Sequence, residues 1–145
     1  MKRDWAAIIA IASIAAAGCG KGTAELSIAT VGDTMAYDVS SLTVKSGQSV
    51  HLVLTNRGTS QVMKHNWVLV QPGHEADIAT AAISAGEAAN YVPRGDANVL
   101  ASTSLASAGA TSEVTFTAPA TGSYPYICTF PGHSATMKGT LVVTP

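Results

Sequence analysis

Short stretches in which apolar and polar residues alternate recur along most of the chain. Val50, Leu52 and Leu54 alternate with His51, Val53 and Thr55, as expected of a strand with one buried face. Turn residues such as Lys45–Gln48 and Asn56–Gly58 separate these stretches. The pattern predicts about eight strands, over residues 25–29, 42–44, 50–54, 65–70, 99–105, 113–117, 124–128 and 137–143. Their number and spacing favour an all-β, Greek-key sandwich or barrel.

One internal stretch departs from the alternation. Glu75–Ala89 is rich in alanine and glutamate and has no period of two, which predicts a short helical insertion between strands. Pro93–Asp96 then returns the chain to the sheet.

The N-terminus has the pattern of an export signal. Met1–Arg3 is basic, and Trp5–Ala17 is an apolar run too short to span a bilayer, which takes about 20 residues. The run closes on Ala16–Gly20, which resembles a bacterial lipoprotein signal in which cleavage leaves a lipid-modified Cys19. An ordinary secretory peptide with a chance cysteine is the alternative. We therefore expect a signal peptide at 1–18, a lipidated tether at 19–23 and one domain at 24–145.

Charge and cysteine content argue against some partners and favour a metal site. The formal net charge of −1, with 12% charged residues, argues against a nucleic-acid partner and leaves the lipid as the only expected link to a membrane. The chain has two cysteines. If Cys19 is lipidated, Cys128 is a single thiol in a compartment that favours disulfides, and metal ligation would explain it. A Cys19–Cys128 disulfide is the alternative, although it would tie a flexible terminus to a motif-rich loop.

The segment Cys128–Met137 contains the densest set of metal-ligating residues. Its thiolate, imidazole and thioether lie within ten residues, in the spacing Cys-x4-His-x3-Met. Two histidines, one cysteine and a weak axial methionine form the blue-copper ligand set. The segment supplies Cys128, His133 and Met137, and His65 at the head of the predicted strand 65–70 is the candidate for the second histidine. Taken singly, each of these residues is more often a core or surface residue, so the joint spacing is the evidence.

This segment, its continuation Lys138–Leu141 and the segment His65–Leu69 closely resemble azurins and auracyanins, which are type 1 (blue) copper proteins of the cupredoxin family. The resemblance extends from about Ala24 to Val143. It implies one copper bound by His65, Cys128 and His133, with Met137 as the distant axial ligand. It also implies a weak contact from the backbone carbonyl of Lys64, where azurins usually have glycine.

The resemblance assigns supporting roles as well. Asn66 would brace the cysteine loop, and the backbone N–H groups of Asn66 and Phe130 would bond the Cys128 sulfur. The azurin disulfide is absent, because Leu26 and Gly47 stand at its positions.

Two histidines of azurins that do not bind copper are also absent here. Asn56 and Ser102 replace them, so a pH-dependent potential of the azurin kind is not expected. His51 and His74 are interpreted as exposed residues that bind no metal.

The family implies a one-electron carrier, not an enzyme, that shuttles electrons between redox proteins such as cytochromes or membrane oxidoreductase complexes. The expected location is the periplasmic or other extracytoplasmic membrane surface. The edge of His133 should reach the surface within an apolar patch that also contains Met35, Phe130, Pro131 and Ala135, suited to transient docking. A Cys128/His133 thiol enzyme would leave His65 and Met137 unexplained. A copper-delivery protein would have an exposed, methionine-rich site, whereas this chain has four methionines.

Overall fold

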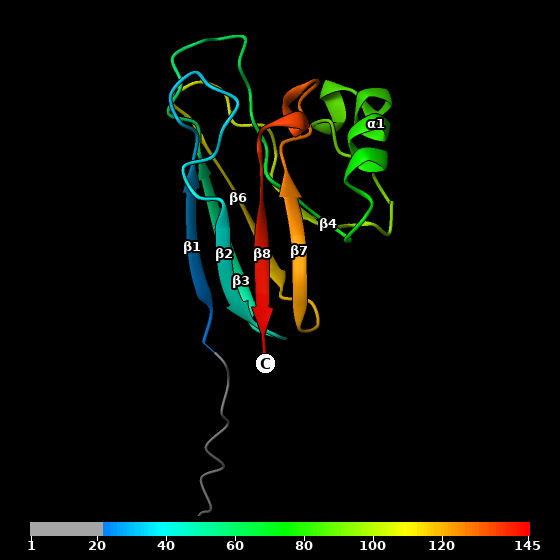
Figure 1. Cartoon of the computed structure of the whole chain (residues 1–145). Coiled ribbons are helices and arrows are strands. Elements are labelled where there is room, and N and C mark those ends of the chain that lie inside the picture. The colour runs from blue at the N-terminus through cyan, green and yellow to red at the C-terminus, as the bar shows by residue number, and fades with distance from the viewer. Residues whose placement is uncertain (1–21) are drawn as a thin grey trace, which may run out of the picture.

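The computed structural model describes residues 22–145, which form two packed β-sheets with a helical insertion on one side (Figure 1). One sheet has the strand order β1-β3-β6 and the other β2-β8-β7-β4-β5. The strands are β1 (Ala24–Ala29), β2 (Ser41–Lys45), β3 (Ser49–Thr55), β4 (Val68–Val70), β5 (Val99–Ser102), β6 (Thr111–Thr117), β7 (Gly122–Ile127) and β8 (Lys138–Thr144). The predicted all-β sandwich of about eight strands is confirmed.

The predicted helical insertion is also confirmed. It consists of α1 (Glu75–Ala85) and the 3-10 turn η1 (Glu87–Ala89), with a second 3-10 turn, η2 (His133–Ala135), in the segment between β7 and β8. None of the helices in residues 22–145 is long and apolar enough to cross a membrane.

The core has two parts that β4 separates. Trp67 and Leu69 belong to the cluster between the sheets, whereas Val68 and Val70 pack with Ile78 of α1 in a second cluster. Both faces of β4 are therefore covered, which explains why its sequence is a continuous apolar run.

The predicted strand 65–70 is shorter than expected. Regular pairing begins only at Val68, and His65 forms an isolated bridge with Ala106. Between them the Trp67 backbone N–H bonds the Thr103 hydroxyl (3.0 Å), and the Asn66 carbonyl accepts the Tyr37 hydroxyl (2.6 Å). These two bonds replace strand pairing and give the segment before β4 its irregular path.

Both ends of the described chain lie at one pole of the sandwich (Figure 1). β1 starts and β8 ends there, and the segment between β7 and β8, with its neighbouring loops, lies at the opposite pole.

His51, interpreted above as exposed, is instead a partly buried bridge between three strands. It lies opposite Glu25 in the register of β3 with β1, with its Nδ1 2.6 Å from the Glu25 carboxylate. Its Nε2 lies 3.3 Å from the carboxylate of Glu113 on β6. Hydrogen bonds to Glu25 and then to Glu113 raise the pKa of His51 above its ordinary value of 6.5.

This arrangement predicts a pH-dependent increment of stability. Because the pKa of His51 is raised in the folded state, the stabilisation by this bridge is fully present below pH 6.5. It is lost as the pH rises through the pKa of His51 in the folded protein. Urea unfolding of the metal-free protein at pH 6 and pH 9 should show a larger loss for the wild type than for His51→Gln. Equal losses in the two proteins would show that the bridge contributes nothing.

Candidate metal centre

The ten residues from Cys128 to Met137 form a tightly closed loop. The Cys128 N–H donates to the Met137 carbonyl (3.0 Å), and the His133 carbonyl accepts the Met137 N–H (2.8 Å). Gly132 precedes η2 in the left-handed region, with φ 83°, where a side chain would be strained. The loop therefore presents a thiol, an imidazole and a thioether from one rigid unit.

His65 approaches this loop from the other side of the site. Its two backbone bonds with Ala106 (3.1 and 2.7 Å) fix its position ahead of β4. Its Nδ1 lies 3.9 Å from the Cys128 sulfur and 3.1 Å from the Met137 sulfur. The Nδ1 of His133 lies 3.6 Å from the same Cys128 sulfur. Four donor atoms from two separate segments thus converge on one point.

The donor set fits a copper ion. Among residues 22–145, His65, Cys128 and His133 are the only group of three or more histidine, cysteine or acidic residues placed to hold a metal. With metal bonds of about 2.0 Å to nitrogen and 2.3 Å to sulfur, donors in a trigonal plane lie roughly 3.7 Å apart. The two separations from the Cys128 sulfur, 3.6 and 3.9 Å, bracket that value. Two imidazoles with a soft thiolate and a soft thioether are the ligands that copper takes in trigonal sites.

Burial sets the protonation states of these groups. Desolvation lowers the pKa of His65 to about 4 and also lowers the pKa of His133 below its ordinary value. Both rings are therefore neutral at pH 7 and can ligate. Burial raises the pKa of the Cys128 thiol to about 11, although backbone N–H groups of Asn66 and Phe130 bond the sulfur and lower it. A bound cation would have to displace the thiol proton.

Asn66 connects the two ligand-bearing segments. Its side-chain oxygen accepts the Thr129 N–H (2.8 Å), and its amide nitrogen donates to the Thr129 hydroxyl (2.8 Å). Thr129 was not singled out from the sequence, although its place directly after Cys128 was a usable signal. The pair holds the residue after His65 against the residue after Cys128.

The residues expected to surround His133 lie at the same pole. Of the four converging residues, His133 alone is accessible, at 3%, while the other three are at 0%. The Phe130 ring lies 4.7 Å from the His133 ring, and Thr136 bonds the Met35 carbonyl (3.1 Å). Pro131, Ala135 and Met35 are exposed. Val62, in the loop before His65, is also an exposed large apolar residue, at 77%.

The other residues named from the sequence are Lys64, the two further histidines and the two cysteines. The Lys64 side chain pairs with Glu87, and a contact of the Lys64 carbonyl with copper stays a prediction. His51 and His74 are not part of the metal-ligating group. Within residues 22–145 Cys128 is a buried free thiol, whereas the signal peptide and Cys19 lie outside the described residues.

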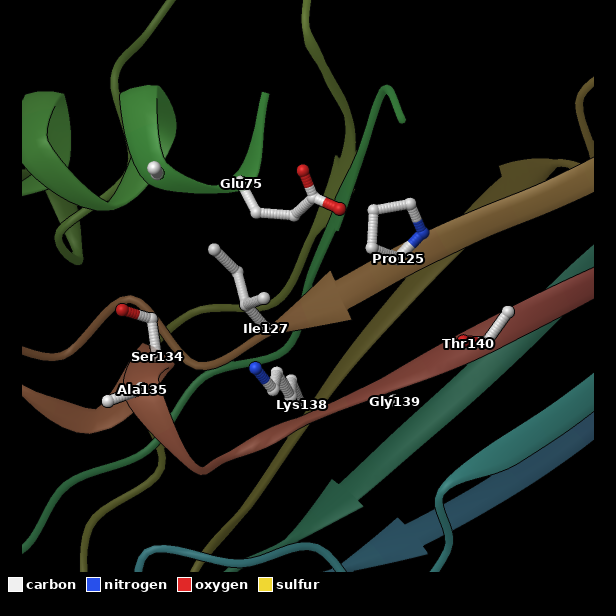
Figure 2. A pocket seen from close by; sticks show the side chains of 9 residues that line it. Glu75, Pro125, Ile127, Ser134, Ala135, Lys138, Gly139 and Thr140 are labelled. Atoms are coloured by element: carbon white, nitrogen blue, oxygen red, sulfur yellow. The ribbon is translucent and has the colours of Figure 1, made fainter. Parts of the chain in front are cut away.

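A groove lies beside the site without reaching the donor atoms. It has a volume of about 560 Å³ and lies between the start of α1 and the strands β7 and β8 (Figure 2). Its lining is Glu75, Ala76, Pro125, Ile127, Ser134, Ala135, Lys138, Gly139 and Thr140. Because no donor atom lines this groove, it gives no substrate access to the Cys128–His133 pair.

This chain is similar to known copper proteins over most of its length. The profile of the family "Copper binding proteins, plastocyanin/azurin family" matches residues 24–144. Auracyanin-A of Chloroflexus aurantiacus is 48% identical over 126 residues, covering 86% of this chain and 76% of that protein. Azurin of Pseudomonas fluorescens biotype C is 37% identical over 117 residues, covering 77% and 91%. The structure of auracyanin A, described as a "blue" copper protein, superposes with a TM-score of 0.80 at 47% identity, covering 85% of this chain and 100% of that one.

Proposed function

Because this chain belongs to the plastocyanin/azurin family of copper-binding proteins, we propose that it carries single electrons between redox proteins on the outer face of a bacterial membrane. The observation that carries the proposal is the convergence of two imidazole nitrogens and two sulfurs, from His65, Cys128, His133 and Met137, in a buried site. A bound copper would supply the redox chemistry by alternating between Cu(II) and Cu(I).

The four residues have different roles in this proposal. His65 and His133 donate through Nδ1 and Cys128 through its sulfur, and together they define the trigonal set. Met137 would supply a weak thioether ligand, which would tune the potential. The carbonyl of Lys64 is a further weak contact.

The protein's contribution to electron transfer is a site that does not rearrange. Backbone hydrogen bonds or packing in the sandwich core hold all four donor residues in place. Their burial keeps water away from the donor atoms. The sulfur accepts N–H bonds from Asn66 and Phe130, which hold the thiolate orientation. These contacts would keep the ligands nearly fixed while a bound copper changed its oxidation state.

The burial of three of the four ligands also favours this function over copper delivery. A delivery site must expose its ligands to a partner, whereas His65, Cys128 and Met137 are fully buried.

A direct test is to add Cu(II) to the metal-free protein. One equivalent should produce an intense blue colour from thiolate-to-copper charge transfer and a narrow copper hyperfine splitting in electron paramagnetic resonance. A colourless complex, or an ordinary wide splitting, would refute the proposed function.

We further propose that electrons enter and leave through the accessible edge of His133. The surrounding apolar residues Met35, Phe130, Pro131 and Ala135 would dock transiently with cytochromes or membrane oxidoreductase complexes. Weak electron-transfer encounters bury less surface than permanent interfaces, so we expect the contact with a partner to be short-lived.

Placing a charge in this patch should slow electron transfer between two copies of the protein. Ala135→Glu puts like charges face to face when two His133 edges meet, so the self-exchange rate should fall about tenfold or more at low salt. NMR line broadening in mixtures of the oxidised and reduced forms measures this rate.

A matched control introduces the same charge elsewhere. Thr43→Glu, at an exposed position of β2, should leave the self-exchange rate unchanged. If Ala135→Glu exchanges as fast as Thr43→Glu, the docking surface lies elsewhere.

The export signal at 1–18 and the lipidated Cys19 complete the proposal. They would place domain 24–145 at the extracytoplasmic membrane surface, through the tether at 19–23. Mass spectrometry of the mature N-terminus distinguishes a lipidated Cys19 from an ordinary secretory cleavage.

A further inference from the structure

The end of the helical insertion contains an unusual backbone segment. Among residues 22–145, only Asn90 and Tyr91 have a positive φ without being glycine, with values of 57° and 51°. Two consecutive left-handed residues with side chains are unfavourable, and such strain persists only where the surroundings enforce it. The contacts of this segment should therefore show what keeps it in the left-handed conformation.

The left-handed pair directs two successive carbonyls at the metal centre. The Asn90 carbonyl accepts the Asn66 amide (2.8 Å), and the Tyr91 carbonyl accepts the Thr129 hydroxyl (2.6 Å). Asn66 and Thr129 are the two residues that join the ligand-bearing segments, and both are buried. Asn66 and Thr129 therefore each donate one side-chain hydrogen bond to a carbonyl of the left-handed pair.

Further contacts connect the same segment with neighbours of His65 and of the Cys128 loop. The Asn90 side chain accepts the Leu105 N–H (3.1 Å), next to the Ala106 that bridges His65. The Tyr91 ring packs edge-on against Phe130, with ring centroids 5.3 Å apart. Glu87 at the start of η1 pairs with Lys64, the residue before His65.

We propose that Asn90 and Tyr91 are positioning residues whose left-handed backbone fixes the Asn66–Thr129 pair and, through it, the separation of His65 from Cys128. This inference rests on the proposed copper function. It gives the helical insertion a task in the metal centre, which it performs without supplying a ligand.

The experiment compares two substitutions that differ only in backbone preference. Asn90→Ala and Asn90→Gly both remove the bond to Leu105, but only glycine adopts a positive φ without strain. Cu(II) affinity, measured by competition with a chelator, should fall about tenfold or more in Asn90→Ala, the range seen when outer-shell support is lost. Asn90→Gly should stay within about threefold of the wild type and keep its copper hyperfine splitting.

A control separates positioning from general destabilisation. Gly47 has φ 71° in the β2–β3 turn, and a Cβ there meets no atom within 4 Å, so Gly47→Ala introduces the same kind of strain away from the copper pole. Gly47→Ala should lower the melting temperature of the metal-free protein and leave the copper affinity and spectrum unchanged.

Each result decides the inference. Loss of stability in Asn90→Ala with wild-type copper affinity and spectrum would overturn it, because the pair would then be only structural. Equal copper defects in the alanine and glycine variants would overturn it by assigning the effect to the bond with Leu105. If Asn90→Ala does not fold, the glycine variant decides alone, since a tenfold loss of affinity there contradicts the proposal. A wild type that forms no blue complex refutes the copper function instead.

Discussion

Replacing Cys128 with serine is expected to abolish the blue colour of the Cu(II) complex completely. The colour requires a thiolate bonded to the metal, and Cys128 is the only cysteine of the described chain. Serine offers a hydroxyl that does not ionise near pH 7, so it is a poor replacement for a soft ligand. Copper affinity should fall by at least about 100-fold, and any remaining complex should show a wide hyperfine splitting.

The metal-free proteins provide the control for this experiment. Serine is close to cysteine in size, so Cys128→Ser should keep the far-ultraviolet circular dichroism of the wild type. It should cost only about 1–2 kcal/mol, because a hydroxyl is buried where the sulfur packed. A variant that folds and still turns blue would remove Cys128 from the ligand set.

The second large effect is expected at Gly139, which has no metal-binding role. It lies opposite Tyr126 in the register of β7 with β8. A Cβ at this position would lie 2.3 Å from the Tyr126 ring, which is fully buried and whose hydroxyl donates to the Val39 carbonyl (2.6 Å). Gly139→Ala must therefore displace a core tyrosine or separate two central strands.

The expected cost is about 3 kcal/mol or more of unfolding free energy, at the upper end of overpacking effects. For a domain of this size that corresponds to a fall in melting temperature of roughly 10 °C. Gly122→Ala on β7 is the matched control, because its Cβ would lie 3.4 Å from the nearest Tyr124 atom, an ordinary contact. Equal melting temperatures for the two variants would show that Tyr126 moves aside at little cost.

The β-sandwich and the convergence of the four donors could both be predicted from the sequence. Alternation identifies strands because side chains on a half-buried strand face core and solvent in turn. The short spacing from Cys128 to Met137 leaves a loop between adjacent strands few ways to separate its three donors. His65 was a candidate from its place at the head of a predicted strand, and the resemblance then supported it, because a histidine 63 positions before Cys128 has no local pattern that links the two.

Other features could not be read from the sequence. The late start of β4 depends on bonds from Thr103 and Tyr37, which are distant along the chain. The left-handed pair at 90–91 follows an unremarkable alanine-rich stretch, and its carbonyls bond Asn66 and Thr129, which are distant along the chain. The bridging role of His51 depends on strand register, which aligns it with Glu25. Each of these is a tertiary constraint that overrides local preference.

The placement of both ends of the described residues at the pole opposite the metal centre bears on where electrons can go (Figure 1). A strand of seven residues such as β8 spans about 20 Å. With the proposed anchor preceding β1, a domain standing upright on its tether would hold the copper end about that distance above the lipid headgroups, facing outward. Such an orientation selects for partners that diffuse past or project from the membrane. A quinone dissolved within the bilayer would be out of reach.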